Sequence, residues 1–131
     1  MTIVHDTQTV LVVEDDQGIA DMLGWILRDA GFRVYTAATV AAALECADEV
    51  CPDLVVADLI LPDGLGSELV ILLKRYAVCR PATLMMSAHP QAKEQAERAG
   101  ADACLSKPFD LDEFYDTVYQ LTDHAEHTGC Y

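Results

Sequence analysis

Basic residues are scarce in this chain, and their scarcity narrows the range of possible partners. The 131 residues include 8 Lys or Arg and 22 Asp or Glu, which gives a formal net charge of −14. A nucleic-acid or anionic-membrane surface needs a basic patch, so we expect neither nucleic acid nor membrane as a partner. A cation or a basic protein surface is the kind of partner that this charge favours.

Long apolar runs are also absent from the sequence. No run approaches the roughly 18–20 apolar residues that a membrane-spanning helix requires. The opening residues, MTIVHDTQ, contain no basic segment followed by a long apolar segment, so a secretory signal is not expected. These two observations favour a cytoplasmic protein.

Closely spaced cysteine pairs are missing as well. The chain contains five cysteines, an odd number, and none of them form a CxxC motif: Cys46, Cys51, Cys79, Cys104 and Cys130. Free thiols in a reducing compartment are therefore favoured over a disulfide framework.

The hydrophobic content, in contrast, is high enough for one well-packed core. Hydrophobic residues make up 52% of the chain and charged residues 23%, which is typical of a globular domain. A chain of this length fits one domain without metal or disulfide staples. We expect that domain over residues 9–122, with flexible ends at 1–8 and 123–131.

Short apolar runs alternate with helical patterns along the chain. Unbroken apolar strands that alternate with helices predict an α/β fold with a parallel sheet covered on both faces. Asp16 is placed to cap the first helix, which should end near Gly31. The last helix should bury Leu111, Phe114, Val118 and Leu121. Strands are predicted at 9–13, 32–37, 53–61, 82–87 and 102–106, and the later helices at 39–50, 67–77, 90–101 and 110–121.

Polar residues stand where the predicted strands end. Glu14 and Asp15 follow the first strand, Asp58 belongs to the third, Ser87 ends the fourth and Lys107 follows the fifth. In open α/β sheets, ligands bind beyond the carboxyl ends of the strands. Acids at a single strand end are often caps or solvated turns, but carboxylates from neighbouring strands need a counter-charge. Lys107 or a hard cation such as Mg2+ could supply it.

Four segments together carry a family resemblance. LVVEDD, VVADLILPDG, MMSA and LSKPF resemble the motifs of the receiver domain of two-component response regulators, in that order and over about residues 9–121. The resemblance implies a flavodoxin-like, doubly wound (βα)5 fold, similar to the chemotaxis regulators, with five parallel strands in the order 2-1-3-4-5.

The resemblance also implies a phosphoryl site that requires Mg2+. Asp58 would accept the phosphoryl group from a phosphohistidine of a sensor histidine kinase or histidine phosphotransfer protein. Asp15 would bind Mg2+ directly, together with Asp58 and the backbone carbonyl of Ile60, and Glu14 would bind it through water. The phosphoryl oxygens would be contacted by two further residues, Ser87 and Lys107.

A phosphorylation-dependent signalling switch is therefore the leading interpretation, with an output protein that the sequence does not identify. Such a switch catalyses its own phosphorylation and is not a turnover enzyme. The alternative is a receiver-like interaction module that is never phosphorylated. A Mg2+-dependent phosphatase ranks low, because Ile60 stands where a second acid would be needed.

Three positions affect how far the family's properties can be expected of this chain. Cys104 occupies a place where the family commonly has an aromatic residue, so it is either a small buried hydrophobe or the mark of a muted switch. Ile60 and His89 would border the phosphoryl group. Ile60 cannot orient an attacking water, and His89 is either a loop residue or a group that does so. We therefore expect a long-lived phosphoryl group on Asp58.

Overall fold

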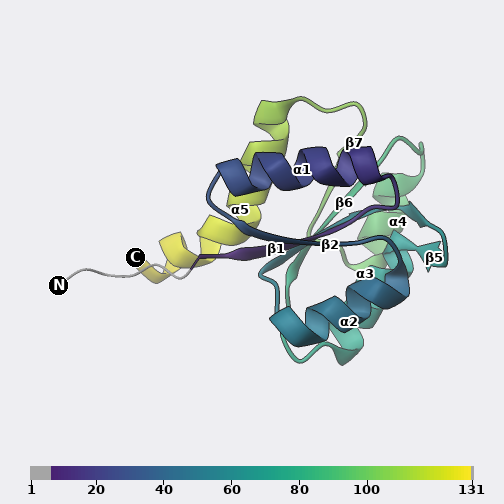
Figure 1. The fold of residues 1–131 in the computed structure, drawn as a ribbon, viewed down its shortest axis with the longest axis horizontal. Helices are drawn as coiled ribbons and strands as arrows, with labels where there is room; N and C mark the ends of the chain where they lie inside the picture. The colour runs from purple at the N-terminus through teal and green to yellow at the C-terminus, as the bar shows by residue number, and fades with distance from the viewer. Residues whose placement is uncertain (1–6, 131) are drawn as a thin grey trace.

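One parallel sheet forms the centre of the molecule (Figure 1). The computed structural model describes the backbone of residues 7–130 and the side chains of residues 7–122. The sheet has five strands in the order β2-β1-β3-β6-β7. The prediction of 2-1-3-4-5 is confirmed, because β4 and β5 form a separate hairpin. The strands of the sheet are β1 (Thr9–Val13), β2 (Arg33–Ala37), β3 (Leu54–Asp58), β6 (Ala82–Ser87) and β7 (Ala103–Ser106).

Helices cover both faces of the sheet (Figure 1). Alternate residues of β1 divide between two cores, since successive side chains of a strand point to opposite faces. Val10 and Val12 pack in the core with α1 and α5, and Leu11 and Val13 in the core with α2 and α3. The helices are α1 (Gln17–Asp29), α2 (Val40–Val50), α3 (Gly66–Tyr76), α4 (Ala92–Ala99) and α5 (Leu111–Cys130).

The boundaries of α1 follow the predicted start and stop signals. The Asp16 side chain accepts a hydrogen bond from the backbone N–H of Ile19 at 3.1 Å, so it is the predicted cap of α1. Gly31 follows the helix with φ of 100°, a conformation that favours glycine.

The buried side chains of α4 are alanines: Ala92, Ala96 and Ala99.

Helix α5 differs from its prediction at both ends. The predicted apolar stripe is wrong at Leu111, which is 49% exposed in the first turn, whereas Phe114 and Val118 are buried. The helix also continues to Cys130 instead of ending at Leu121. Residues 122–128 contain no glycine or proline, so the sequence has no helix breaker before Gly129. Residues 1–6 and 131 of the predicted flexible ends lie outside the described residues.

No helix among the described residues has the length and apolar character needed to cross a membrane.

The chain turns sharply after Asp58, which the predicted strand over 53–61 did not anticipate. The strand β3 ends at Asp58, and the following residues form an antiparallel hairpin of β4 (Ile60–Leu61) and β5 (Gly64–Leu65). Pro62 and Asp63 occupy the turn, and both are residues that favour turns. The third predicted strand was therefore too long at its carboxyl end.

The expectation of free thiols is wrong for two of the cysteines. Cys51 and Cys79 form a disulfide, with their Cα atoms 5.4 Å apart. Each stands three residues before a member of the paired residues Leu54 and Ala82, on the adjacent strands β3 and β6. The strand register therefore brings the two cysteines together. Cys46 and Cys104 are free, as predicted.

Reduction of this disulfide should lower the melting temperature by about 10 °C. A crosslink between residues 28 positions apart lowers the entropy of the unfolded chain and so adds about 3–4 kcal/mol to the free energy of unfolding. Thermal unfolding followed by circular dichroism, with and without a thiol reductant, measures the change. The Cys51→Ser/Cys79→Ser variant should melt at the reduced temperature under both conditions. A wild-type melting temperature that ignores the reductant would contradict the prediction.

Candidate functional site

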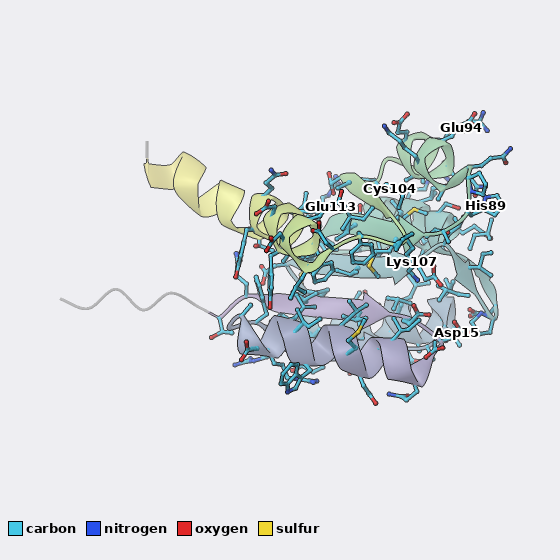
Figure 2. All side chains as sticks on the ribbon, turned by 90° about the horizontal axis from the view of Figure 1, so that it is seen from above. Asp15, His89, Glu94, Cys104, Lys107 and Glu113 are labelled. Carbon is cyan, nitrogen blue, oxygen red and sulfur yellow. A yellow bond between two sulfur atoms is a disulfide. The ribbon has the colours of Figure 1, made fainter. Side chains whose placement is uncertain are left out.

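Carboxylates from two neighbouring strands meet at the carboxyl end of the sheet. The residues Val13 and Ala57 are paired in the β1–β3 register, which brings Glu14 beside Asp58. Carboxylate oxygens of Glu14, Asp15 and Asp58 lie within 4.8 Å of one another. Asp15 and Lys107 lie at this end of the sheet (Figure 2). The structure thus brings together the three acids that the sequence predicted.

Glu14 is the most deeply buried acid of this cluster. Its backbone N–H donates to the carbonyl of Ala37 at 2.9 Å, which continues the β1–β2 pairing and leaves the residue 4% exposed. Burial raises the pKa of Glu14, and the neighbouring Asp58 charge raises it further, while a hydrogen bond from the Asp16 backbone opposes this. Oε1 of Glu14 has no hydrogen-bond partner among the residues described. The charged form of this carboxylate therefore lacks full compensation.

Lys107 supplies a positive charge beside the cluster. Its Nζ lies 3.6 Å from Oε1 of Glu14 and 3.7 Å from Oδ1 of Asp58. The backbone N–H of Lys107 donates to the carbonyl of Ser87 at 2.9 Å, which fixes its position beside β6. Lys107 thus lies beside two of the three carboxylates, and among the described residues the cluster retains an excess of negative charge.

Asp58 offers one carboxylate oxygen toward ligands. The backbone N–H of Leu59 donates to Oδ1 at 2.9 Å, and Lys107 also approaches Oδ1. Within the described part of the chain, no polar contact of this kind falls on Oδ2. The side chain is partly exposed, so Oδ2 is available to a reacting group or a cation.

The donor set fits a hard divalent cation. It consists of carboxylate oxygens from Glu14, Asp15 and Asp58, and one of its buried oxygens lacks a hydrogen-bond partner. Magnesium binds such oxygen ligands and usually keeps several waters, which suits a site with an exposed member such as Asp15. The predicted role of the Ile60 carbonyl stays a prediction. The Ile60 side chain is 57% exposed at the start of the hairpin.

Ser87 ends the neighbouring strand β6, and His89 follows it. Ser87 is buried, and its Oγ accepts a hydrogen bond from the backbone N–H of His89 at 3.0 Å, so its own proton can be donated to a ligand. His89 is exposed, and its Nδ1 accepts from the backbone N–H of Gln91 at 3.1 Å. This bond supports the interpretation of His89 as a loop residue. The contact of Ser87 with a phosphoryl group remains predicted.

Two residues that support the site were missed by the sequence analysis. The backbone N–H of Gly66 donates to the carbonyl of Leu59 at 2.6 Å, and an added Cβ would lie 2.1 Å from the carbonyl oxygen of Asp58. Asp63 accepts hydrogen bonds from the first turn of α2. The only signal for either was the segment PDGLG, which reads as an ordinary turn.

Comparison with known protein families identifies the kind of domain in which this site lies. The response regulator receiver domain family matches residues 10–119. The chain belongs to this family. The site described above is therefore the carboxylate site of a receiver domain. It comprises the carboxylate cluster and the lysine after β7.

Two named relatives of this receiver domain are transcriptional regulators. It is 39% identical over 104 residues to the KDP operon transcriptional regulatory protein KdpE of Escherichia coli, an alignment covering 79% of this chain and 46% of KdpE. It is 35% identical over 103 residues to the phosphate regulon transcriptional regulatory protein PhoB of Klebsiella pneumoniae, covering 76% and 45%. The chain therefore spans about half the length of the curated relatives it matches.

Solved structures show the same fold over almost their whole length. A CheY-like receiver domain protein from Methanospirillum hungatei superimposes with a TM-score of 0.83 at 26% identity, covering 94% of this chain and 99% of that one. The chemotaxis response regulator CheY4 of Vibrio cholerae gives a TM-score of 0.78 at 29% identity, with 88% and 98% covered. These similarities confirm the predicted flavodoxin-like receiver fold.

Cys104 is half-buried between the sheet of this receiver domain and helix α4. It is paired with Met85 in the β6–β7 register and packs beside the alanine face of α4. Burial raises the pKa of its thiol, which favours the neutral form of the group. The surroundings therefore fit a small hydrophobic residue, and a muted switch stays a prediction.

Replacing Glu14 with glutamine should raise the melting temperature by a few degrees in the absence of divalent cations. The change removes a buried charge that Asp58 repels and Lys107 offsets only in part. Thermal unfolding in a chelator measures this effect. The control is Glu45→Gln on the exposed side of α2, which removes the same charge and should change little. Equal shifts in both variants, or a lower melting temperature for Glu14→Gln, would contradict the argument.

Proposed function

We propose that this receiver domain is a phosphorylation-dependent signalling switch of a two-component system or phosphorelay. In this proposal Asp58 accepts a phosphoryl group from a phosphohistidine of a sensor histidine kinase or histidine phosphotransfer protein, with Mg2+ required. The observation that carries the proposal is the cluster of Glu14, Asp15 and Asp58, with the ammonium of Lys107 beside Glu14 and Asp58. The domain would turn over no outside substrate and would act in the cytoplasm.

The chemistry assigns a step to each residue of the site. Oδ2 of Asp58 attacks the phosphorus atom, the P–N bond to the donor imidazole breaks, and its electron pair stays on the imidazole nitrogen, which takes up a proton. Phosphoryl transfer depends mainly on alignment and on neutralising the phosphoryl oxygens. A bound Mg2+ would supply most of that neutralisation. Glu14 and Asp15 would hold the cation beside Asp58 and so keep the acceptor aligned.

Lys107 and Ser87 can respond to the new charge. Lys107 pairs with Asp58 across 3.7 Å in the unphosphorylated site, and the added phosphoryl oxygens are a stronger partner for its ammonium. The Ser87 hydroxyl can donate its proton to the same group. Because these residues lie at the ends of β7 and β6, their movement would reach the surface formed by α4, β7 and α5. An output protein bound there would then sense the phosphoryl group.

Beryllofluoride, which mimics a phosphoryl group on a carboxylate, tests this function directly. With Mg2+ present, it should bind the wild-type chain and leave Asp58→Ala unbound, as measured by fluorine NMR and calorimetry. The matched control is Asp16→Ala, which removes an acid of the same segment outside the cluster and should retain binding. Failure of the wild type to bind, or full binding by Asp58→Ala, would favour the alternative of an unphosphorylated interaction module.

A further inference from the structure

The hairpin that follows Asp58 makes contacts at its base, on one side and at its tip. At its base, the backbone N–H of Gly66 donates to the carbonyl of Leu59 at 2.6 Å. On one side, Leu61 is buried in the core formed by β1, α2 and α3. The tip of the hairpin, at Asp63, extends beyond this core to the amino terminus of α2.

Asp63 binds the first turn of α2 with both carboxylate oxygens. Oδ1 accepts from the backbone N–H of Val40 at 2.7 Å, and Oδ2 accepts from that of Ala41 at 3.0 Å. Oγ1 of Thr39 accepts a hydrogen bond from the N–H of Ala42 at 3.0 Å, and among the described residues this is the one side-chain cap that the helix segment itself provides. Its first turn contains no acidic residue. Asp63 therefore supplies the negative charge that favours a helix amino terminus, from more than twenty positions away in the sequence.

The same bonds keep this carboxylate charged. They lower the pKa of Asp63 below its usual range, the bond from Val40 having the larger effect. The contact between the hairpin and α2 is therefore a charge-assisted, two-point bond at neutral pH, a type that fixes direction as well as distance.

We propose that Asp63 is a positioning residue for the phosphoryl site, which holds the hairpin after Asp58 against α2 and thereby fixes the backbone at Asp58 and Ile60. This inference rests on the proposed function, because it assigns Asp63 a role in Mg2+ binding and phosphorylation. Ile60 is paired with Leu65 across the hairpin, so a rotation of the tip would move the Ile60 carbonyl relative to the three acids. Leu61 alone leaves such a rotation possible, since an apolar contact has no preferred direction.

The comparison of Asp63→Ala with Thr39→Ala separates this role from simple helix capping. Both variants remove side-chain caps from the first turn of α2, but only Asp63 belongs to the hairpin. We expect Asp63→Ala to weaken Mg2+ binding about tenfold and to slow phosphorylation to a similar extent. Loss of a residue that orients metal ligands from outside the coordination shell commonly has an effect of this size. Thr39→Ala should change both by less than about twofold, although both variants should lower the melting temperature.

Calorimetric titration with Mg2+ alone gives the affinity, and phosphoramidate as a small phosphodonor gives the rate, both on the full chain. Asp63→Asn is the conservative variant: its single amide oxygen can accept one of the two N–H groups, so its Mg2+ affinity should lie between those of the wild type and Asp63→Ala. It also provides the test if Asp63→Ala fails to fold.

The outcomes are distinguishable. Unchanged Mg2+ affinity in the Asp63 variants with a lowered melting temperature would reduce Asp63 to a helix cap and overturn the inference. Equal weakening by Thr39→Ala would overturn it too, because the effect would then come from α2 as a whole. A wild-type chain that binds no Mg2+ and accepts no phosphoryl group would instead refute the proposed function.

Discussion

Replacing Asp15 with alanine should abolish Mg2+-dependent phosphorylation of Asp58, whereas replacing Asp16 with alanine should leave it intact. The two acids are adjacent, but the structure places them differently. Asp15 belongs to the carboxylate cluster with Glu14 and Asp58. The Asp16 side chain faces α1, where it caps the N–H of Ile19 at 3.1 Å. In the proposed function, loss of Asp15 would remove a direct ligand of the Mg2+ that would neutralise the phosphoryl oxygens.

The measurement combines phosphorylation rate and stability for both variants. With phosphoramidate and Mg2+, Asp15→Ala should show no phosphorylation above the rate seen in a chelator, and Asp16→Ala should react at nearly the wild-type rate. In denaturant unfolding, Asp16→Ala should lose about 1 kcal/mol, the usual contribution of an acidic helix cap. Asp15→Ala should lose no stability when Mg2+ is absent. Equal functional loss from the two variants would show that the division between ligand and cap is wrong.

This division of labour among three consecutive acids was only partly visible in the sequence. The capping role of Asp16 followed from its place before an apolar helical pattern, and the structure confirms it. The burial of Glu14 could not be predicted from the sequence in the same way. It depends on the hydrogen bond from its backbone to Ala37, which extends the β1–β2 pairing by one residue. Burial of that kind is a property of the assembled sheet.

The convergence of Asp58 with Lys107 was predictable for a different reason. In a parallel sheet every carboxyl end lies at one edge, so polar residues at successive strand ends are brought together by topology alone. The pairing of Cys51 with Cys79 required more than topology. It depends on the register between β3 and β6, and the odd number of cysteines favoured the wrong conclusion. The tertiary contact of Asp63 with α2 likewise had no local signal beyond a turn.

Gly66 is the residue whose replacement should damage the site most without removing any reacting group. A Cβ at this position would lie 2.1 Å from the carbonyl oxygen of Asp58 and 3.0 Å from its carbonyl carbon. Both atoms are backbone, so no side chain can rotate away. The backbone at Asp58 must shift by more than about 1 Å to restore ordinary contact distance, and such a displacement of a reacting group can slow the reaction about a hundredfold.

We therefore expect Gly66→Ala to phosphorylate about a hundredfold more slowly than the wild type and to lose about 3 kcal/mol of stability. The control is Gly24→Ala in α1, where the nearest atom to an added Cβ is the flexible Arg28 side chain at 3.2 Å. That variant should react normally and gain about 0.5–1 kcal/mol from the higher helix propensity of alanine. Phosphorylation kinetics with phosphoramidate and denaturant unfolding measure both effects. A Gly66→Ala variant that keeps the wild-type rate would show that β3 can move at Asp58 without consequence, and the close contact with α3 would then have no role in aligning the acceptor.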